Sequence, residues 1–247
     1  LNREHTGSNS DEGSLSHQRL TKRWSDGKPI PGYIKTFSGS NRNGEVDMIQ
    51  SMLRVTYTSP RTMHWITKLL TFLVESERNE GIEADLVNTL RDYSREKVKV
   101  AFFTPKEPRG FSINRIVFTY LDYLLWEQNG KDPDFRFSFR NSIEHFYPQN
   151  PREDESGPEV SDECLHMLGN LALVSVSANS KFSSSLPRTK VEIFGKTIAS
   201  QGPKLQLMAE IARNKGWSEE EVRAHHEAMV NCLRQDLGLS PLADSSV

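Results

Sequence analysis

The chain has 247 residues, of which 31 are lysine or arginine and 33 are aspartate or glutamate, so its formal net charge is −2. This balance excludes nucleic-acid binding through bulk positive charge, and any such contact must come from a local patch. The length is enough for one large domain or two modest ones. Cys164 and Cys232 have neither metal-type spacing nor a disulfide framework, which indicates a reduced, cytoplasmic setting. No apolar run is long enough to span a membrane.

The N-terminal segment, residues 1–44, is polar and rich in Ser, Gly, Asn, Lys and Arg. Because it has few large apolar residues, it predicts a flexible tail or linker. The chain begins with Leu1, and we therefore expect it to be a fragment of a longer protein.

Residues 45–130 show the three-to-four-residue spacing of apolar side chains that is typical of amphipathic helices. The pattern predicts helices over residues 46–57, from Ser59-Pro60 onward, over 82–97 and over 112–128. Pro60 suits a helix start, because the missing N–H of proline costs little in the first turn. Such stripes are typical of core packing, so this segment is interpreted as a helical scaffold.

Residues 131–200 change to a pattern of short strands. Phenylalanines alternate with other residues from Phe135 to Phe139, as in a strand with one buried face that continues to His145. Residues 171–176 are a second apolar run and predict its partner strand. Ser175 or Ser177 then suits the cap of a short helix.

Two further helices are expected in residues 201–247, packed on this core. Gly202-Pro203 begins the first, and Ser218-Glu219-Glu220-Glu221 is a capping-box start for the second. On the second helix, His225 and His226 project about 100° apart, so they chelate one metal ion poorly. The sequence thus predicts a predominantly helical α+β protein.

The candidate catalytic and metal-binding residues begin in the segment 143–149, Ile-Glu-His-Phe-Tyr-Pro-Gln. Glu144 stands beside His145, Asn170 follows a glycine, and Asn179 lies nine positions further on. A neutral imidazole is a suitable base near pH 7, which makes His145 the candidate that activates water. Glu144 and the amide oxygen of Asn179 are the hard donors that Mg²⁺ prefers. These groups favour a one-metal site that cleaves phosphodiester bonds.

Structural interpretations of the same residues remain open. Glu144 and His145 also suit a surface salt bridge, Asn170 an ordinary turn and Asn179 a helix cap. An excess of basic residues follows, with five between positions 165 and 204 against one acidic residue, Glu192. The five are Lys181, Arg188, Lys190, Lys196 and Lys204. A local excess of this kind suits a polyanion, although exposed lysines are often only solvated.

The order and spacing of these pieces resemble the C-terminal nuclease domain of the GmrSD-type, modification-dependent restriction endonucleases, a branch of the HNH (His-Me finger) nucleases. Family members typically carry an acidic-His-x-x-Pro-Gln stretch, then Gly-Asn-Leu-x-Leu, then Asn-x-Lys with a nearby lysine. The matching residues are Glu144, His145, Pro148, Gln149, Gly169, Asn170, Leu171, Leu173, Asn179, Lys181 and Lys190. The resemblance is firm over residues 141–190 and looser over the helical stretch before them.

The resemblance implies a ββα-metal (His-Me finger) motif on the helical scaffold, with strand, loop, strand and helix in that order. It implies that Asn170 pins the loop and orients the base, as supporting groups around a metal site do. The implied cofactor is Mg²⁺ or Mn²⁺. Lys181, Arg188 and Lys190 are expected to contact DNA phosphates.

The predicted function is a divalent-metal-dependent DNA endonuclease, the nuclease part of a restriction enzyme used in phage defence. The family's Asp-Gly-Gln-Gln-Arg stretch, which marks a nucleotide-hydrolysing ParB-like domain, is not found here. Such a domain is expected from a missing portion or a separate subunit, and pairing into a homo-oligomer would allow both strands to be cut. Two alternatives are a catalytically silent nucleic-acid-binding or regulatory module and a helical interaction subunit whose hairpin is structural.

Overall fold

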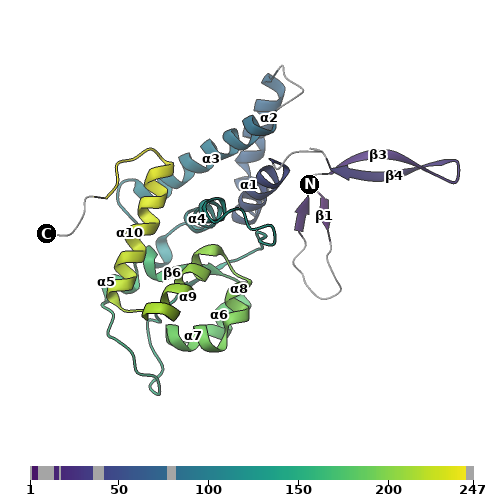
Figure 1. Cartoon of the computed structure of the whole chain (residues 1–247). Helices are drawn as coiled ribbons and strands as arrows, with labels where there is room; N and C mark the ends of the chain where they lie inside the picture. Colours follow the sequence, from purple (N-terminus) through teal and green to yellow (C-terminus); the bar gives the residue numbers. More distant parts are fainter. Residues whose placement is uncertain (1, 5–13, 17, 36–41, 77–81, 243–247) are drawn as a thin grey trace. The chain divides into compact units, whose positions relative to one another are not determined.

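The computed structural model describes residues 2–4, 14–16, 18–35, 42–76 and 82–242 (Figure 1). The chain divides into two compact units. Unit 1 comprises residues 1–93 with 136–139, and unit 2 comprises residues 94–135 with 140–247. Within the described ranges, no helix combines the length and the apolar character needed to cross a lipid bilayer.

The N-terminal segment of unit 1 contains short antiparallel strands. They are β1 (Asn2–Glu4) paired with β2 (Ser14–Ser16), and β3 (Gln18–Ser25) paired with β4 (Lys28–Lys35). The turn of the second pair is Asp26-Gly27, with φ angles of 51° and 72° in the left-handed region that a tight hairpin turn uses. The prediction of a flexible tail missed this hairpin, for which Asp-Gly was the available signal. Residues 5–13 and 36–41 of that predicted tail lie outside the described residues.

The helices of unit 1 form where apolar stripes were predicted, but the second stripe is exposed at Ile66, Leu70 and Leu73 and is not a core face. The elements are α1 (Arg42–Thr56), the 3₁₀ turn η1 (Pro60–Thr62), α2 (His64–Glu75) and the first part of α3 (Glu83–Phe103). Pro60 opens only the three-residue turn η1, and the longer helix expected from Ser59-Pro60 onward begins at His64. The stripe of α1 is buried at Val46, Ile49 and Leu53, which confirms its assignment to a core face.

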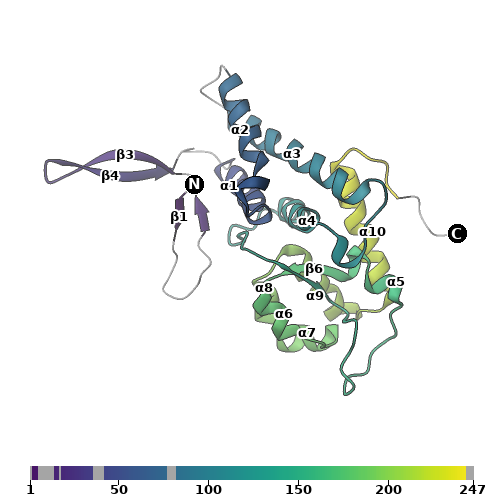
Figure 2. The same ribbon diagram turned by 180° about the vertical axis from the view of Figure 1, so that it is seen from behind.

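Unit 2 is built mainly of helices around one small sheet. Its elements after α3 are η2 (Gly110–Ser112), α4 (Arg115–Gln128), β5 (Ser142–His145), α5 (Asp162–Leu165), η3 (Leu168–Asn170), β6 (Leu171–Val174), α6 (Val176–Phe182), α7 (Pro187–Ile193), α8 (Gly195–Ala199), α9 (Pro203–Lys215) and α10 (Glu219–Asp236). Figure 1 and, from behind, Figure 2 show α6, α7 and α8 grouped with α9 beside β6. This is the predominantly helical α+β class that the sequence predicts.

The sheet of unit 2 is an antiparallel pair in which Ser142 lies opposite Val174 and His145 lies opposite Leu171. The first strand is shorter than predicted. The phenylalanines from Phe135 to Phe139 are not in a strand, and β5 begins only at Ser142. Phe135 and Phe137 are nonetheless buried and Phe139 is exposed, so the alternation marked a partly packed segment that is not a strand.

Helix α6 follows β6 directly, which gives the predicted order of strand, loop, strand and helix. The Ser175 side chain caps α6 by accepting a hydrogen bond from the Ala178 N–H at 3.1 Å. The capping box of Ser218 and Glu221 likewise starts α10. These starts are confirmed because each depends on residues within one helical turn.

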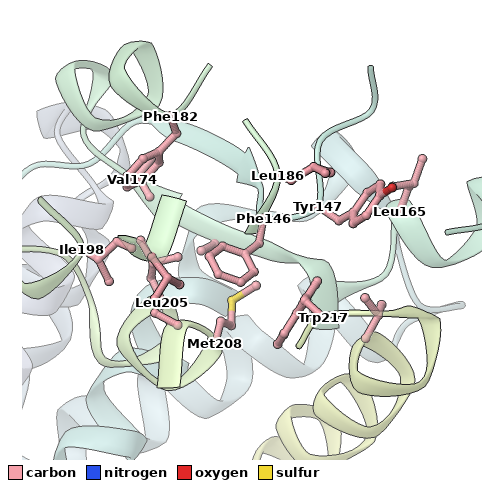
Figure 3. Packing of buried hydrophobic residues seen from close by; sticks show 14 of the residues in the cluster. Phe146, Tyr147, Leu165, Val174, Phe182, Leu186, Ile198, Leu205, Met208 and Trp217 are labelled. Carbon is pink, nitrogen blue, oxygen red and sulfur yellow. The ribbon is translucent and has the colours of Figure 1, made fainter. Parts of the chain in front are cut away.

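A buried apolar cluster holds the hairpin against the short helices (Figure 3). Phe146, the residue after β5, is fully buried and meets Trp217 edge to face, with 5.0 Å between ring centroids. At Gly169 a Cβ would lie 2.2 Å from the Val222 carbonyl oxygen, so only glycine lets this backbone pack directly on α10. Packing therefore fixes the chain just after β5, at Phe146, and just before β6, at Gly169.

Candidate functional site

His145 is the last residue of β5, and two other rings flank its imidazole. Its Nε2 lies 3.2 Å from Nδ1 of His166, and the Phe111 ring meets it edge to face with 5.2 Å between centroids. The side chain is mostly enclosed, with 6% of the residue exposed. Burial, then the neighbouring charges of His166 and Lys190, lower the pKa of His145 to about 4. The ring is therefore neutral at pH 7, the state that a general base requires.

Glu144, the preceding residue, has a different partner. Its Oε1 accepts a hydrogen bond from Lys190 Nζ at 2.6 Å, and both side chains are buried. β5 includes both Glu144 and His145, and successive side chains of a strand point to opposite faces. The strand therefore separates the carboxylate, held by α7, from the imidazole, which lies against His166.

Lys190 is 0% exposed, and its ammonium group holds the end of β5. Besides Glu144, it donates to the carbonyl oxygens of His145 and Phe146, each at 2.8 Å. Three acceptors use all three N–H groups, so Lys190 is charged in this arrangement. Burial lowers the Lys190 pKa and raises the Glu144 pKa, while their mutual attraction opposes both shifts. Contrary to the sequence prediction, Lys190 is not placed to contact DNA phosphates.

Asn170 is fully buried and braces the loop between the strands. Its Oδ1 accepts from the Tyr147 N–H at 2.8 Å and from Trp217 Nε1 at 3.1 Å. Its Nδ2 donates to the carbonyl oxygens of Tyr147 at 3.0 Å and Leu165 at 3.1 Å. These hydrogen bonds hold the Tyr147 and Leu165 backbone together. Any effect of Asn170 on the orientation of His145 stays a prediction.

Asn179 and two of the predicted cations lie on α6 and α7. Asn179 is half-buried on α6, a helix that contacts β5, and Lys181 is exposed on the same helix. Arg188 is exposed on α7, where it donates to Glu192 Oε1 at 2.9 Å. Of the five basic residues in the predicted excess, Lys190 and Lys204 are buried. The basic surface is thus reduced to Lys181, Arg188 and Lys196.

The oxygen donors near β5 suit a hard divalent cation better than zinc. In the described part of the chain, no three His, Cys, Asp or Glu side chains gather in a metal-binding cluster. Mg²⁺ needs no such cluster, since it keeps several waters and takes one or two protein oxygens. Glu144 has a second oxygen beside the one bound to Lys190, and Asn179 offers an amide oxygen. Both groups are oxygen donors of the kind that Mg²⁺ or Mn²⁺ takes.

Two neighbours of His145 were not predicted as site residues. His166 lies between α5 and η3, and Phe111 lies in η2. Gly110 joins them, because its N–H donates to the His166 carbonyl oxygen at 2.8 Å. No motif connects these positions in the sequence, since folding alone brings η2 to the end of β5.

Comparison with family models gives one match over this region. The model of the GmrSD restriction endonucleases, C-terminal domain, matches residues 92–232. Comparisons with curated proteins and with solved structures gave no significant match. The matched range covers more than half of the chain and includes all the candidate residues from Glu144 to Lys190. The chain belongs to the family of GmrSD restriction endonuclease C-terminal domains.

Proposed function

We propose that this chain is the nuclease domain of a restriction endonuclease and hydrolyses phosphodiester bonds in DNA with His145 as general base. The observation that supports this most is the neutral imidazole at the end of β5, within a strand–strand–helix unit. We take this unit as the ββα motif of HNH nucleases. The family's description as restriction endonucleases makes DNA the proposed substrate.

In the proposed reaction, His145 takes a proton from water as the water oxygen bonds to phosphorus. The bond from phosphorus to the leaving sugar oxygen breaks, and that oxygen takes a proton from solvent. With a pKa of about 4, the His145 imidazole is a weak base when no DNA is bound. A bound phosphate would bring negative charge near the ring and raise that pKa toward the working pH.

A divalent cation would stabilise the charge that develops on the phosphoryl oxygens. Glu144 and Asn179 would hold it through their side-chain oxygens. The Lys190 ammonium favours the ionised form of Glu144, against the effect of burial, and fixes the peptide groups of His145 and Phe146. Lys181 and Arg188 would contact phosphates further along the DNA. Recognition is assigned to a ParB-like nucleotide-hydrolysing domain or subunit outside this chain, and two copies would pair to cut both strands.

Plasmid cleavage with Mg²⁺ or Mn²⁺ tests this proposal. We expect nicking by the unaltered chain, and loss of nicking in His145→Ala or with chelator. His64→Ala is the matched control, because His64 is an exposed histidine of unit 1 and should leave cleavage unchanged. Cleavage that survives both His145→Ala and chelator would overturn the assignment.

The catalytically silent module is the second candidate, and the pairing of Glu144 with Lys190 favours it, because the carboxylate already has a cationic partner. Tight DNA binding without nicking, in each of Mg²⁺, Mn²⁺ and Ca²⁺, would support that alternative. Fluorescence anisotropy with a labelled duplex measures binding, and gel analysis of the same samples measures nicking.

A further inference from the structure

The contact between the His145 and His166 rings constrains where their protons lie. Nε2 of His145 and Nδ1 of His166 are 3.2 Å apart, and the ring planes are inclined at 84°. A neutral imidazole has one N–H donor and one acceptor nitrogen. A hydrogen bond between two such nitrogens therefore requires that one of them carries a hydrogen and the other a lone pair.

Asp162 biases this choice from the far side of His166. Its Oδ1 lies 3.6 Å from Nε2 of His166, at the i,i+4 spacing of adjacent helical turns. A carboxylate only accepts, so it favours a hydrogen on His166 Nε2. With the hydrogen on Nε2, Nδ1 of His166 keeps its lone pair and accepts from His145. Asp162 is 93% exposed, so the bias is modest.

This bias favours one tautomer of His145. If its Nε2 carries the hydrogen, its Nδ1 holds the free lone pair. Within the described residues, His145 Nδ1 makes no hydrogen bond, and this atom is not fully enclosed. The nitrogen able to take a proton is therefore also the nitrogen left open.

Gly110 and Phe111 hold the two rings in place. Gly110 has a φ of 58°, and a Cβ there would lie 3.0 Å from Nδ1 of His166. Glycine thus leaves space beside the accepting nitrogen while its N–H binds the His166 carbonyl oxygen. Phe111 packs on the His145 ring from the next position. Backbone and ring contacts together fix the approach of the two imidazoles.

We propose that His166 is a positioning residue for His145. Its Nδ1 accepts a hydrogen bond from His145 Nε2, which leaves the lone pair of His145 Nδ1 to take the proton from water. The effect on cleavage rests on the nuclease function proposed above. The hydrogen bond and the tautomer do not depend on that function.

A pair of isosteric substitutions tests the role in cleavage. In His166→Asn, the amide oxygen can replace Nδ1 as the acceptor, whereas in His166→Gln the amide group replaces Nε2. We expect His166→Asn to keep most of the cleavage rate, and His166→Gln to lower kcat on the order of 10- to 100-fold with KM for DNA little changed. Equal losses in two variants of equal stability would overturn the proposal. So would equal retention of activity.

Long-range ¹H–¹⁵N NMR of ¹⁵N-histidine-labelled protein reads the tautomer without any cleavage. The His145 signal is assigned from its loss in His145→Ala. We expect a protonated Nε2 and an unprotonated Nδ1 in the unaltered chain, with His166→Asn keeping that tautomer and His166→Gln losing it. A protonated Nδ1 would overturn the proposal even in an active nuclease. The expected tautomer in a chain that cleaves no DNA would support the hydrogen bond and overturn only the nuclease function.

Discussion

Two buried lysines hold the two strands of the hairpin in unit 2, and they do so differently. Lys190, from α7, binds the carbonyl oxygens of His145 and Phe146 at the end of β5. Lys204, from α9, donates to the carbonyl oxygen of Leu171 at 2.6 Å, at the start of β6. Because His145 lies opposite Leu171 in the sheet, both ammonium groups act at the same end of the hairpin.

The two lysines differ in how their charge is compensated. Lys190 has three oxygen acceptors, one of them the Glu144 carboxylate. Lys204 Nζ has one oxygen acceptor and a 3.4 Å contact with the Met208 sulfur. The nearby Asp122 accepts from the Lys204 backbone N–H at 2.9 Å. Burial lowers the pKa of Lys204 to about 7, against only partial compensation by Asp122. A buried ammonium therefore stays charged where oxygen acceptors surround it and becomes titratable where they do not.

Replacing Lys190 with methionine should have the largest effect on stability. The substitution leaves the buried Glu144 carboxylate without its cation and two carbonyl oxygens without a donor. Removing one partner of a buried ion pair costs about 3–5 kcal/mol. Urea unfolding measures the loss. The double variant Lys190→Met/Glu144→Gln should recover part of it, because no buried charge then remains unpaired. A loss below about 1 kcal/mol would contradict the role given to Lys190.

Near pH 7, Lys204→Met should lower the unfolding free energy less than Lys190→Met does, by about 1–3 kcal/mol, because one carbonyl oxygen loses its donor. The sharper result is the pH dependence. The folded pKa of about 7 lies below the ordinary 10.5, so the unfolded chain binds more protons between these values. The unfolding free energy of the unaltered chain should then rise with pH above 7, by at most about 1.4 kcal/mol per unit.

Urea unfolding at pH 7 and pH 9 measures this pH dependence. The quantity compared is the gap in unfolding free energy between the unaltered chain and Lys204→Met. Subtraction removes the contributions of groups whose pKa does not depend on Lys204. Burial raises the pKa of Asp122 to about 6 and lowers that of His225, so both are deprotonated throughout this pH window. The gap should be wider at pH 9. A constant gap would show that the Lys204 ammonium is as well compensated as that of Lys190.

Features that depend on residues close together in the sequence could be predicted from it. Ser175, the Ser218–Glu221 box and Pro203 start their helices as predicted, since each signal depends on residues within one turn. The strand–strand–helix order also followed from short apolar runs and the family motif. These features place His145, Asn170 and Asn179 on the elements expected of them.

The sequence could not indicate which charged groups fold inward. Lys190 and Lys204 were grouped with Lys181 as one basic excess, although only Lys181 of the three is exposed. Their acceptors are backbone carbonyl oxygens and carboxylates from other elements, which no spacing rule connects to a lysine. The contact of His145 with His166 was missed for the same reason, because it forms only when the loop after α5 closes on β5.

The exposed cations should show the smallest effect on stability and the clearest effect on binding. Lys181→Ala and Arg188→Ala should each leave the unfolding free energy nearly unchanged. If Lys181 contacts a phosphate, its loss should lower the slope of log K against log salt by about 1. Arg188 should have the smaller effect, because it must first leave Glu192.

Anisotropy titrations of a labelled duplex at several salt concentrations measure that slope, in a His145→Ala background that prevents cleavage. Lys68→Ala is the matched control, since Lys68 is an exposed lysine on α2 of unit 1. An unchanged slope in Lys181→Ala would show that this lysine is only solvated. A slope reduced equally by Lys68→Ala would show that charge anywhere on the chain suffices, and that the surface of α6 and α7 has no special part in holding DNA.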